Sequence, residues 1–233
     1  MQKKISCERV KREDVGEEWR MNVSDIKEIL EKLGKERRIF HCEADFQYAL
    51  ACKFYENKTR LGIKEIRLEW RSFINEKNDY IDIILITKND ERIPIELKYK
   101  TKKTHKLKDQ NGEEFELKNH GARDLGGYGF IKDIEKIESF IKKYPEKSNK
   151  GYVIFLTNDL KYLDPPNSKE VCYINFSIHQ SRKLGNKTLC WIGEKKPWKK
   201  DPIKLRREYK INWEKYSSLE DQEFKFILLE VSL

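Results

Sequence analysis

Apolar residues recur at helical spacing in two parts of the chain, 43–57 and 131–144. The clearest stripe consists of Phe46, Leu50 and Phe54, each four residues after the one before, which places them on one face of a helix. The first helix has Ser24 as its expected cap and Gly34 as its expected end. The predicted helices cover residues 25–33, 43–57 and 131–144.

Short runs rich in isoleucine predict β-strands between and after these helices. The run Ile93-Pro94-Ile95-Glu96-Leu97-Lys98-Tyr99 alternates strictly, so its apolar residues share one face while Glu96 and Lys98 share the other. The segment Asp109-Gln110-Asn111-Gly112 is expected at a hairpin tip with a type I′ turn. The predicted strands cover residues 64–70, 80–87, 92–99, 151–157, 171–177, 188–192 and 223–231.

The order of these elements predicts an α/β or α+β domain with one central mixed sheet flanked by helices, and of the two we favour α/β. A chain of 233 residues suits one domain, 1–233. Within it we expect an N-terminal arm and helix over 1–38, a core over 40–160, and C-terminal strands over 161–233.

Composition excludes several classes of protein. The chain is 38% hydrophobic and 12% aromatic, which is too apolar for a disordered chain. Its apolar runs are too short to cross a bilayer, and no secretory signal is expected. The five cysteines are scattered along the chain, which favours neither a disulfide framework nor a zinc site. The four histidines are dispersed, which argues against a histidine metal site. We therefore expect a cytoplasmic protein that does not bind membranes.

The net charge of +9 is concentrated in two stretches. Residues 97–108 carry six lysines and no acid, and residues 195–210 carry eight basic and two acidic residues. Such blocks attract polyanions, and aromatic residues such as Trp198 could stack on bases. Solvated surface is the alternative interpretation of both blocks. The basic residues expected to contact nucleic acid are Lys100, Lys102, Lys103, Arg123, Lys199, Lys200, Arg206 and Arg207.

A candidate site lies in two of the predicted strands. Asp82 interrupts the apolar run 80–87, and a buried charge needs a partner. If the turn between the strands has three residues, Asp82 lies opposite Glu96, whereas a two-residue turn places it opposite Leu97. We predict the first register. Two adjacent carboxylates favour a cation between them, and Mg²⁺ prefers carboxylate, water and phosphate oxygens.

The constellation of Asp82, Glu96-Leu97-Lys98 and a helical Glu43 resembles the PD-(D/E)XK superfamily of restriction-endonuclease-like phosphodiesterases. The likeness covers about residues 40–100, and Ile81 stands where the motif's name has proline. It implies an αβββαβ core and a Mg²⁺-dependent nuclease. It further implies that Asp82, Glu96 and the carbonyl of Leu97 bind the metal, that Lys98 assists the attacking water, and that Glu43 assists metal or water placement.

The sequence also allows other interpretations. Glu96 and Lys98 could form an exposed ion pair, with Asp82 at a strand end. The chain could bind nucleic acid without cutting it, act on RNA instead of DNA, or serve as a protein-interaction domain. Cutting both strands of a duplex would favour a homodimer. The glycine-rich segment 119–129 is either a loop leading into a helix or a mobile segment in which Arg123 or Tyr128 meets a phosphate.

Overall fold

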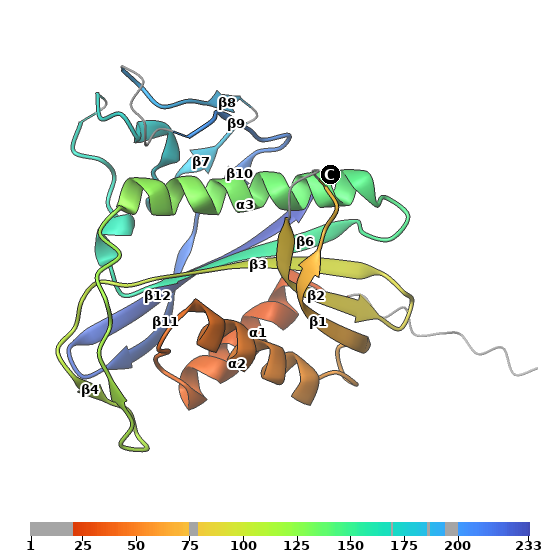
Figure 1. Ribbon diagram of the computed structural model, residues 1–233, viewed down its shortest axis with the longest axis horizontal. Helices are drawn as coiled ribbons and strands as arrows, with labels where there is room; N and C mark the ends of the chain where they lie inside the picture. The colour runs from red at the N-terminus through yellow and green to blue at the C-terminus, as the bar shows by residue number, and fades with distance from the viewer. Residues whose placement is uncertain (1–20, 75–78, 169, 186, 194–199) are drawn as a thin grey trace, which may run out of the picture.

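The computed structural model describes residues 21–74, 79–168, 170–185, 187–193 and 200–233 (Figure 1). These residues form an α/β fold built on one mixed sheet of six strands, in the order β1-β2-β3-β6-β12-β11. Strands β3 and β6 are parallel, and every other neighbouring pair in this sheet is antiparallel. The strands are β1 (Ile63–Arg71), β2 (Tyr80–Thr87), β3 (Arg92–Lys100), β6 (Lys150–Thr157), β11 (Trp213–Leu219) and β12 (Gln222–Ser232).

Helices cover both faces of the sheet. Figure 1 shows α1 and α2 on one face and α3 running across the other. Each face has its own buried cluster, because the apolar residues of the strands alternate in direction. Leu97 and Tyr99 of β3 pack toward α1 and α2, so the side chains of Glu96 and Lys98 project toward α3. The helices are α1 (Val23–Glu36), α2 (Glu43–Glu56) and α3 (Arg123–Lys143).

Smaller elements lie outside the main sheet. Two-stranded pairs join β4 with β5, β7 with β10, and β8 with β9. These short strands and two 3-10 helices are β4 (Leu107–Lys108), β5 (Glu114–Phe115), β7 (Lys183–Leu184), β8 (Thr188–Leu189), β9 (Ile203–Lys204), β10 (Tyr209–Lys210), η1 (Leu160–Tyr162) and η2 (Ile174–Phe176). Among the described residues, no helix is both long and apolar enough to cross a membrane.

Several predicted boundaries are wrong. The cap of α1 is Asn22, not Ser24, because the Asn22 side chain accepts from the backbone N–H groups of residues 24 and 25, and the helix continues to Glu36. The hairpin at 109–112 forms, but Gly112 alone has a positive φ there, so the turn is not type I′. Asp109 shapes it instead, by accepting from the N–H groups of Asn111 and Glu113.

The C-terminal third differs most from the sequence interpretation. The predicted strand 171–177 is wrong, since it contains η2 and pairs with no strand. The predicted strand 188–192 shrinks to β8, while β11 was not predicted at all. In contrast, the predicted strand 223–231 is confirmed as β12.

Candidate active site

The candidate site lies where β2 and β3 separate. Thr87 N donates to Glu91 O across a turn of three residues, which confirms the predicted register. The paired residues of this hairpin end at Ile83 and Ile95, so Asp82 and Glu96 occupy the next opposed positions. Asp82, Glu96 and Lys98 thus lie just beyond the point where the backbone pairing of β2 with β3 ends.

Two acids take over the hydrogen bonds that β2 no longer provides. Asp82 Oδ2 accepts from Leu97 N at 2.6 Å, and Glu43 Oε2 accepts from Tyr99 N at 2.7 Å. Glu43 is the first residue of α2. Backbone N–H groups inside a protein need partners, so these contacts fix both carboxylates against the edge of β3.

Helix α3 adds two charged residues that the sequence analysis missed. Asp133 Oδ2 lies 2.8 Å from Lys98 Nζ, and Lys136 Nζ lies 2.7 Å from Glu96 Oε1. Both pairs are close enough for the opposite charges to attract strongly. The sequence did hold a signal, because Asp133 interrupts the apolar stripe of α3 between Phe130 and Ile137.

Burial determines the protonation behaviour of the acids. It raises the pKa of Asp82 to about 6, although the charge of Lys98 and the N–H of Leu97 act in the opposite direction. Glu96 is only 2% exposed, and burial together with the charges of Asp133 and Asp82 raises its pKa well above the usual value. Burial also raises the pKa of Asp133. Keeping these buried acids ionised therefore costs free energy, and a bound cation would reduce that cost.

Lys98 stays charged at this position. Burial acts to lower the pKa of its amine, but the nearby acids, Asp133 first, together outweigh burial and the pKa rises. Its Nζ donates to the carbonyl oxygen of Leu97 at 3.0 Å. A fixed cation therefore lies beside both α3 and the Leu97 carbonyl, which the resemblance implies is a metal ligand.

Two further polar residues border the site from α2 and β1. Gln47 lies one turn after Glu43 and donates both to the carbonyl oxygen of Asp82, at 2.8 Å, and to Glu69 Oε1, at 2.7 Å. Glu69 has a φ of 48°, a left-handed conformation that is uncommon for a residue other than glycine. The register of β1 on β2 places Glu69 opposite Asp82. The left-handed residue of β1 thus lies at the level of the candidate site.

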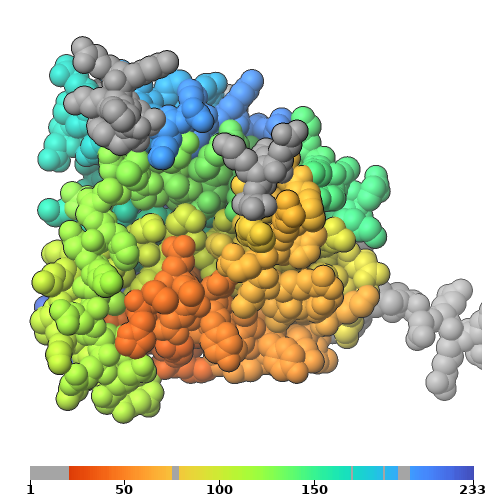
Figure 2. All heavy atoms as spheres, viewed as in Figure 1, coloured from red at the N-terminus to blue at the C-terminus, as the bar shows by residue number. Residues whose placement is uncertain are grey.

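The site opens to solvent on one side. Figure 2 shows the face on which the atoms of β3 are set back between those of α2 and α3. The side chains of Glu43 and Lys100 are 41% and 29% exposed, and their charged atoms are 3.8 Å apart. Glu96 and Asp133 are buried beneath them. A substrate would therefore meet Glu43 and Lys100 before it reaches the buried acids.

The predicted nucleic-acid contacts are distributed unevenly. Lys102 and Lys103 are exposed just after β3, whereas Arg123 pairs with Asp159 at 3.3 Å at the start of α3. Arg206 and Arg207 are exposed and donate their backbone N–H groups to Glu138 of α3. Lys200 is also exposed, and Lys199 lies outside the described residues. Of those that the structure describes, Lys100 is the one whose charged group lies beside an acid of the site, at 3.8 Å from Glu43.

The donor set at the site fits Mg²⁺ only in part. Asp82 and Glu96 supply carboxylate oxygens and Leu97 a carbonyl, the oxygen ligands that Mg²⁺ prefers. However, Glu96 is paired with Lys136, and the Leu97 carbonyl accepts from Lys98. Among the described residues, three metal-ligating side chains come within 4.8 Å of one another only at the exposed His105, Glu220 and Asp221. A metal at the candidate site would thus take two carboxylates and the Leu97 carbonyl, and would displace both amines.

Comparisons with protein-family models, with curated protein sequences and with solved structures gave no match.

Proposed function

We propose that the protein is a Mg²⁺-dependent nuclease that hydrolyses phosphodiester bonds of DNA. The observation that carries this proposal is the meeting of Asp82, Glu96 and Lys98 where β2 and β3 separate, with Glu43 reaching the same point from α2. Paired buried carboxylates beside a fixed amine are suited to stabilising charge on a phosphoryl group through a metal.

The order of elements supports the same proposal. Read along the chain, α2, β1, β2, β3, α3 and β6 follow one another with only the short β4–β5 hairpin inserted. This order is similar to the αβββαβ core that the proposal implies, and β3 and β6 pair in parallel at the centre of the sheet. The proposed catalytic core at 40–160 contains all of these elements.

In this proposal each residue has a distinct task. Asp82, Glu96 and the Leu97 carbonyl would hold Mg²⁺, which when bound supplies Lewis-acid stabilisation of the phosphoryl oxygens. Lys98, held by Asp133, would orient the attacking water and offset the charge that develops on the phosphate. Glu43 would accept a hydrogen bond from that water or help position the metal.

Charge supports a polyanionic substrate, and DNA as that polyanion is part of the proposal. Lys100, Lys102 and Lys103 continue directly from the strand that carries Glu96 and Lys98, so a polyanion bound there would lie across the acids. Cutting both strands of a duplex would require two such sites, which favours a homodimer.

The test is a cleavage assay with Mg²⁺ on purified wild type, Asp82→Ala and Lys98→Ala. The proposal expects cleavage by the wild type, inhibition by EDTA, and loss of about 10²-fold or more in each variant. Cleavage that persists in both variants would rule the proposal out.

A second function, DNA or RNA binding without catalysis, is favoured by one observation. The acids of the site are already paired within the chain, Glu96 with Lys136 and Asp133 with Lys98. Such a module would bind nucleic acid in a salt-sensitive manner without metal, and Asp82→Ala would bind as the wild type does. A nuclease directed at RNA is the remaining alternative, and an RNA strand in the cleavage assay distinguishes it.

A further inference from the structure

The edge of β3 that β2 leaves open extends beyond the acids of the candidate site. Asp82 and Glu43 accept hydrogen bonds from the first two free N–H groups along this edge. Thr101 lies two residues after Tyr99, and alternate N–H groups of a strand point to the same side. Thr101 N donates to Nδ1 of His120 at 3.0 Å. His120 is therefore the next side chain in the row that the two acids begin.

This alternation continues past the end of β3. Lys102 N donates at 2.8 Å to Asn158, the residue after β6, so it points to the opposite side from Thr101 N. Alternate N–H groups on one edge are about 7 Å apart, because a strand rises about 3.3–3.4 Å per residue. The imidazole of His120 thus meets this edge about one such step beyond Glu43.

The backbone fixes which nitrogen of His120 carries the proton. A backbone N–H can only donate, so Nδ1 accepts from Thr101 and the neutral ring has its proton on Nε2. His120 N also donates to the carbonyl oxygen of Thr101 at 2.7 Å, which holds the residue in place. Burial and the charge of Lys100 lower the pKa of His120, although the charge of Glu43 acts in the opposite direction. The exposed ring is therefore neutral at pH 7, and its Nε2–H has no acceptor among the described residues.

Lys100 supplies a positive charge beside this donor. Its Nζ lies 3.8 Å from Glu43 Oε2, which is longer than a hydrogen bond, and that oxygen already accepts from Tyr99 N. The side chain of Lys100 is 29% exposed. Lys98, in contrast, is held by Asp133 at 2.8 Å. Lys100 can therefore turn toward a ligand without breaking a hydrogen bond.

The surface beyond His120 is also basic. Residues 117–120 run antiparallel to residues 101–104, since His120 N donates to Thr101 O and Thr104 N donates to Leu117 O. A hollow of about 440 Å³ borders both segments and is lined by Lys103, Glu116, Leu117, Lys118 and Asn119. A strand that crosses the acids and His120 would thus continue over two lysines and one glutamate.

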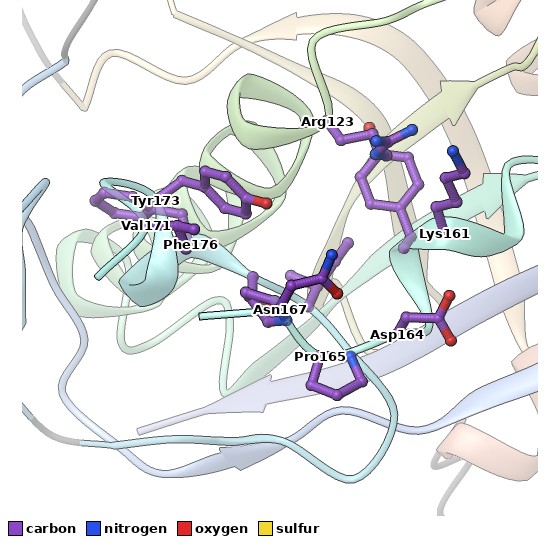
Figure 3. Close-up of a pocket in the computed structure, with 12 residues that line it drawn as sticks. Arg123, Lys161, Asp164, Pro165, Asn167, Val171, Tyr173 and Phe176 are labelled. Atoms are coloured by element: carbon purple, nitrogen blue, oxygen red, sulfur yellow. The ribbon is translucent and has the colours of Figure 1, made fainter. Parts of the chain in front are cut away.

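The start of α3 has a different character. The loop that the sequence allows at 119–129 ends at Ala122, because α3 already begins at Arg123. Arg123 and Lys161 line a cavity of about 370 Å³ there, but Asp164 lines it too (Figure 3). Arg123 is also paired with Asp159 at 3.3 Å. These acids balance the positive charge of the cavity, so Lys161 is a suitable control position.

We propose that the Nε2–H of His120 and the amine of Lys100 bind one phosphate of the substrate strand, next to the phosphate that is cut. The inference deepens the proposed function and rests on it in one respect, namely that the acids beside Glu43 cut this strand. A neutral N–H and a movable ammonium are complementary to phosphate oxygens. Phosphate contacts position a nucleic acid without reading its sequence. The row of side chains along β3 would therefore align the strand over Asp82 and Glu96.

The test measures binding of a labelled DNA oligonucleotide by fluorescence anisotropy at pH 8 in EDTA, so that no strand is cut. His120→Asn keeps an acceptor at the position of Nδ1 but has no donor at that of Nε2, so it should weaken binding by about fivefold or more and leave the melting temperature unchanged. His120→Gln places an N–H near the position of Nε2 but leaves Thr101 N without its acceptor, so it should bind more tightly than His120→Asn and melt at a lower temperature. His179→Asn is the control, because His179 Nδ1 is also hydrogen-bonded, to Ser177 Oγ, outside the candidate site.

The salt dependence of binding separates the two groups. Lys100→Ala should weaken binding by about tenfold and reduce the slope of log K against log salt concentration by about 1, because one fewer phosphate charge is neutralised. His120→Asn should leave that slope unchanged, since a neutral imidazole releases no counterion. Lys161→Ala, which removes the same charge at the cavity beside α3, should bind as the wild type does.

The failure of this proposal can be told from the failure of the proposed function. The phosphate site is wrong if the wild type does not bind the oligonucleotide, if His120→Asn binds as the wild type does, or if Lys100→Ala keeps the wild-type slope, whatever Asp82→Ala does to cleavage. Loss of binding in His120→Gln alone would show that His120 only supports Thr101, and would also overturn the proposal. If both phosphate contacts are found but Asp82→Ala cuts DNA as the wild type does, the proposed function fails and the phosphate site stands.

Discussion

Lys136 Nζ lies 2.7 Å from Glu96 Oε1, so a lysine of α3 is paired with the most buried of the acids at the candidate site. Lys136 also donates to the carbonyl oxygen of Tyr80 at the start of β2. The lysine therefore holds α3, β2 and β3 together where a bound metal would also neutralise Glu96. Lys136 and a metal ion would compete for the same carboxylate.

Replacing Lys136 with methionine tests this competition. Glu96 would lose the one ion-pair partner that it has among the described residues, so the free energy of unfolding in EDTA should fall by about 3 kcal/mol. Addition of Mg²⁺ should then raise the melting temperature of Lys136→Met more than that of the wild type. Lys132→Met is the control, because Lys132 lies one turn earlier and pairs with Glu135 in the same helix. An equal response of the two variants to Mg²⁺ would show that Lys136 does not compete with a metal.

The register of β2 and β3 could be predicted from sequence, whereas Asp133 and Lys136 could not be placed. Alternation along 93–99 fixed which face Glu96 occupies, and a three-residue turn fixed its partner on β2. Lys136 carries no such signal, since a lysine in an amphipathic helix is normally solvated. Its role depends on how α3 is positioned over the sheet, and that positioning depends on contacts distant in sequence.

The predicted start of α3 and the predicted strand 171–177 are wrong for related reasons. Gly126, Gly127 and Gly129 disfavour a helix by propensity, but close packing against Tyr162 and Phe176 compensates for this. Segment 171–177 has the apolar content of a strand, yet it packs Phe176 under α3 instead of pairing with a neighbour. In both cases tertiary packing outweighs the local pattern.

Asp82→Asn should stabilise the metal-free protein at neutral pH. The pKa of Asp82 is raised by burial from 3.8 to about 6, so the folded state binds this proton more tightly than the unfolded state does. The free energy of unfolding therefore falls as pH rises from about 4 to 6, by up to about 3 kcal/mol for this group. Asparagine keeps an oxygen for Leu97 N and carries no charge.

Urea unfolding in EDTA between pH 4 and pH 7 measures this effect. Asp82→Asn should gain about 1–3 kcal/mol over the wild type at pH 7, and the gain should vanish near pH 4. Asp90→Asn is the matched control, since Asp90 is exposed and its hydrogen bond to Lys64 lowers its pKa, so no gain is expected. A wild type more stable than Asp82→Asn at pH 7 without metal would contradict the account of Asp82.

Two variants of Glu43 should separate its contribution to stability from its contribution to cleavage. Glu43→Gln keeps a carbonyl oxygen for Tyr99 N, so its free energy of unfolding should stay within about 1 kcal/mol of the wild type, whereas Glu43→Ala should lose about 1–2 kcal/mol. Both variants should lose cleavage activity. Asp45 shares the first turn of α2 with Glu43 and pairs with Arg37, which follows α1. Asp45→Asn should therefore lower stability and leave activity unchanged. Full activity in Glu43→Gln would assign Glu43 a purely structural role.

Asp133 is expected to act through Lys98. Burial acts to lower the pKa of Lys98, and Asp133 is the largest of the contributions that raise it, so Asp133→Asn should move the alkaline limb of the pH–activity profile to lower pH and reduce cleavage about tenfold or more. Lys98→Met combined with Asp133→Asn should be no less active than Lys98→Met alone. Independent losses that multiply in the double variant would show that Asp133 acts without Lys98.

The most direct measurement is single-turnover cleavage of matched DNA and RNA oligonucleotides by the wild type and Glu96→Gln, with Mg²⁺ and with EDTA. Glu96→Gln keeps the shape of the most buried acid but removes the charge that Asp82 and Glu96 would share with a metal. The account predicts Mg²⁺-dependent cleavage of DNA by the wild type and a loss of at least about 10²-fold in Glu96→Gln. Equal cleavage by the two proteins, or cleavage by the wild type in EDTA, would contradict it.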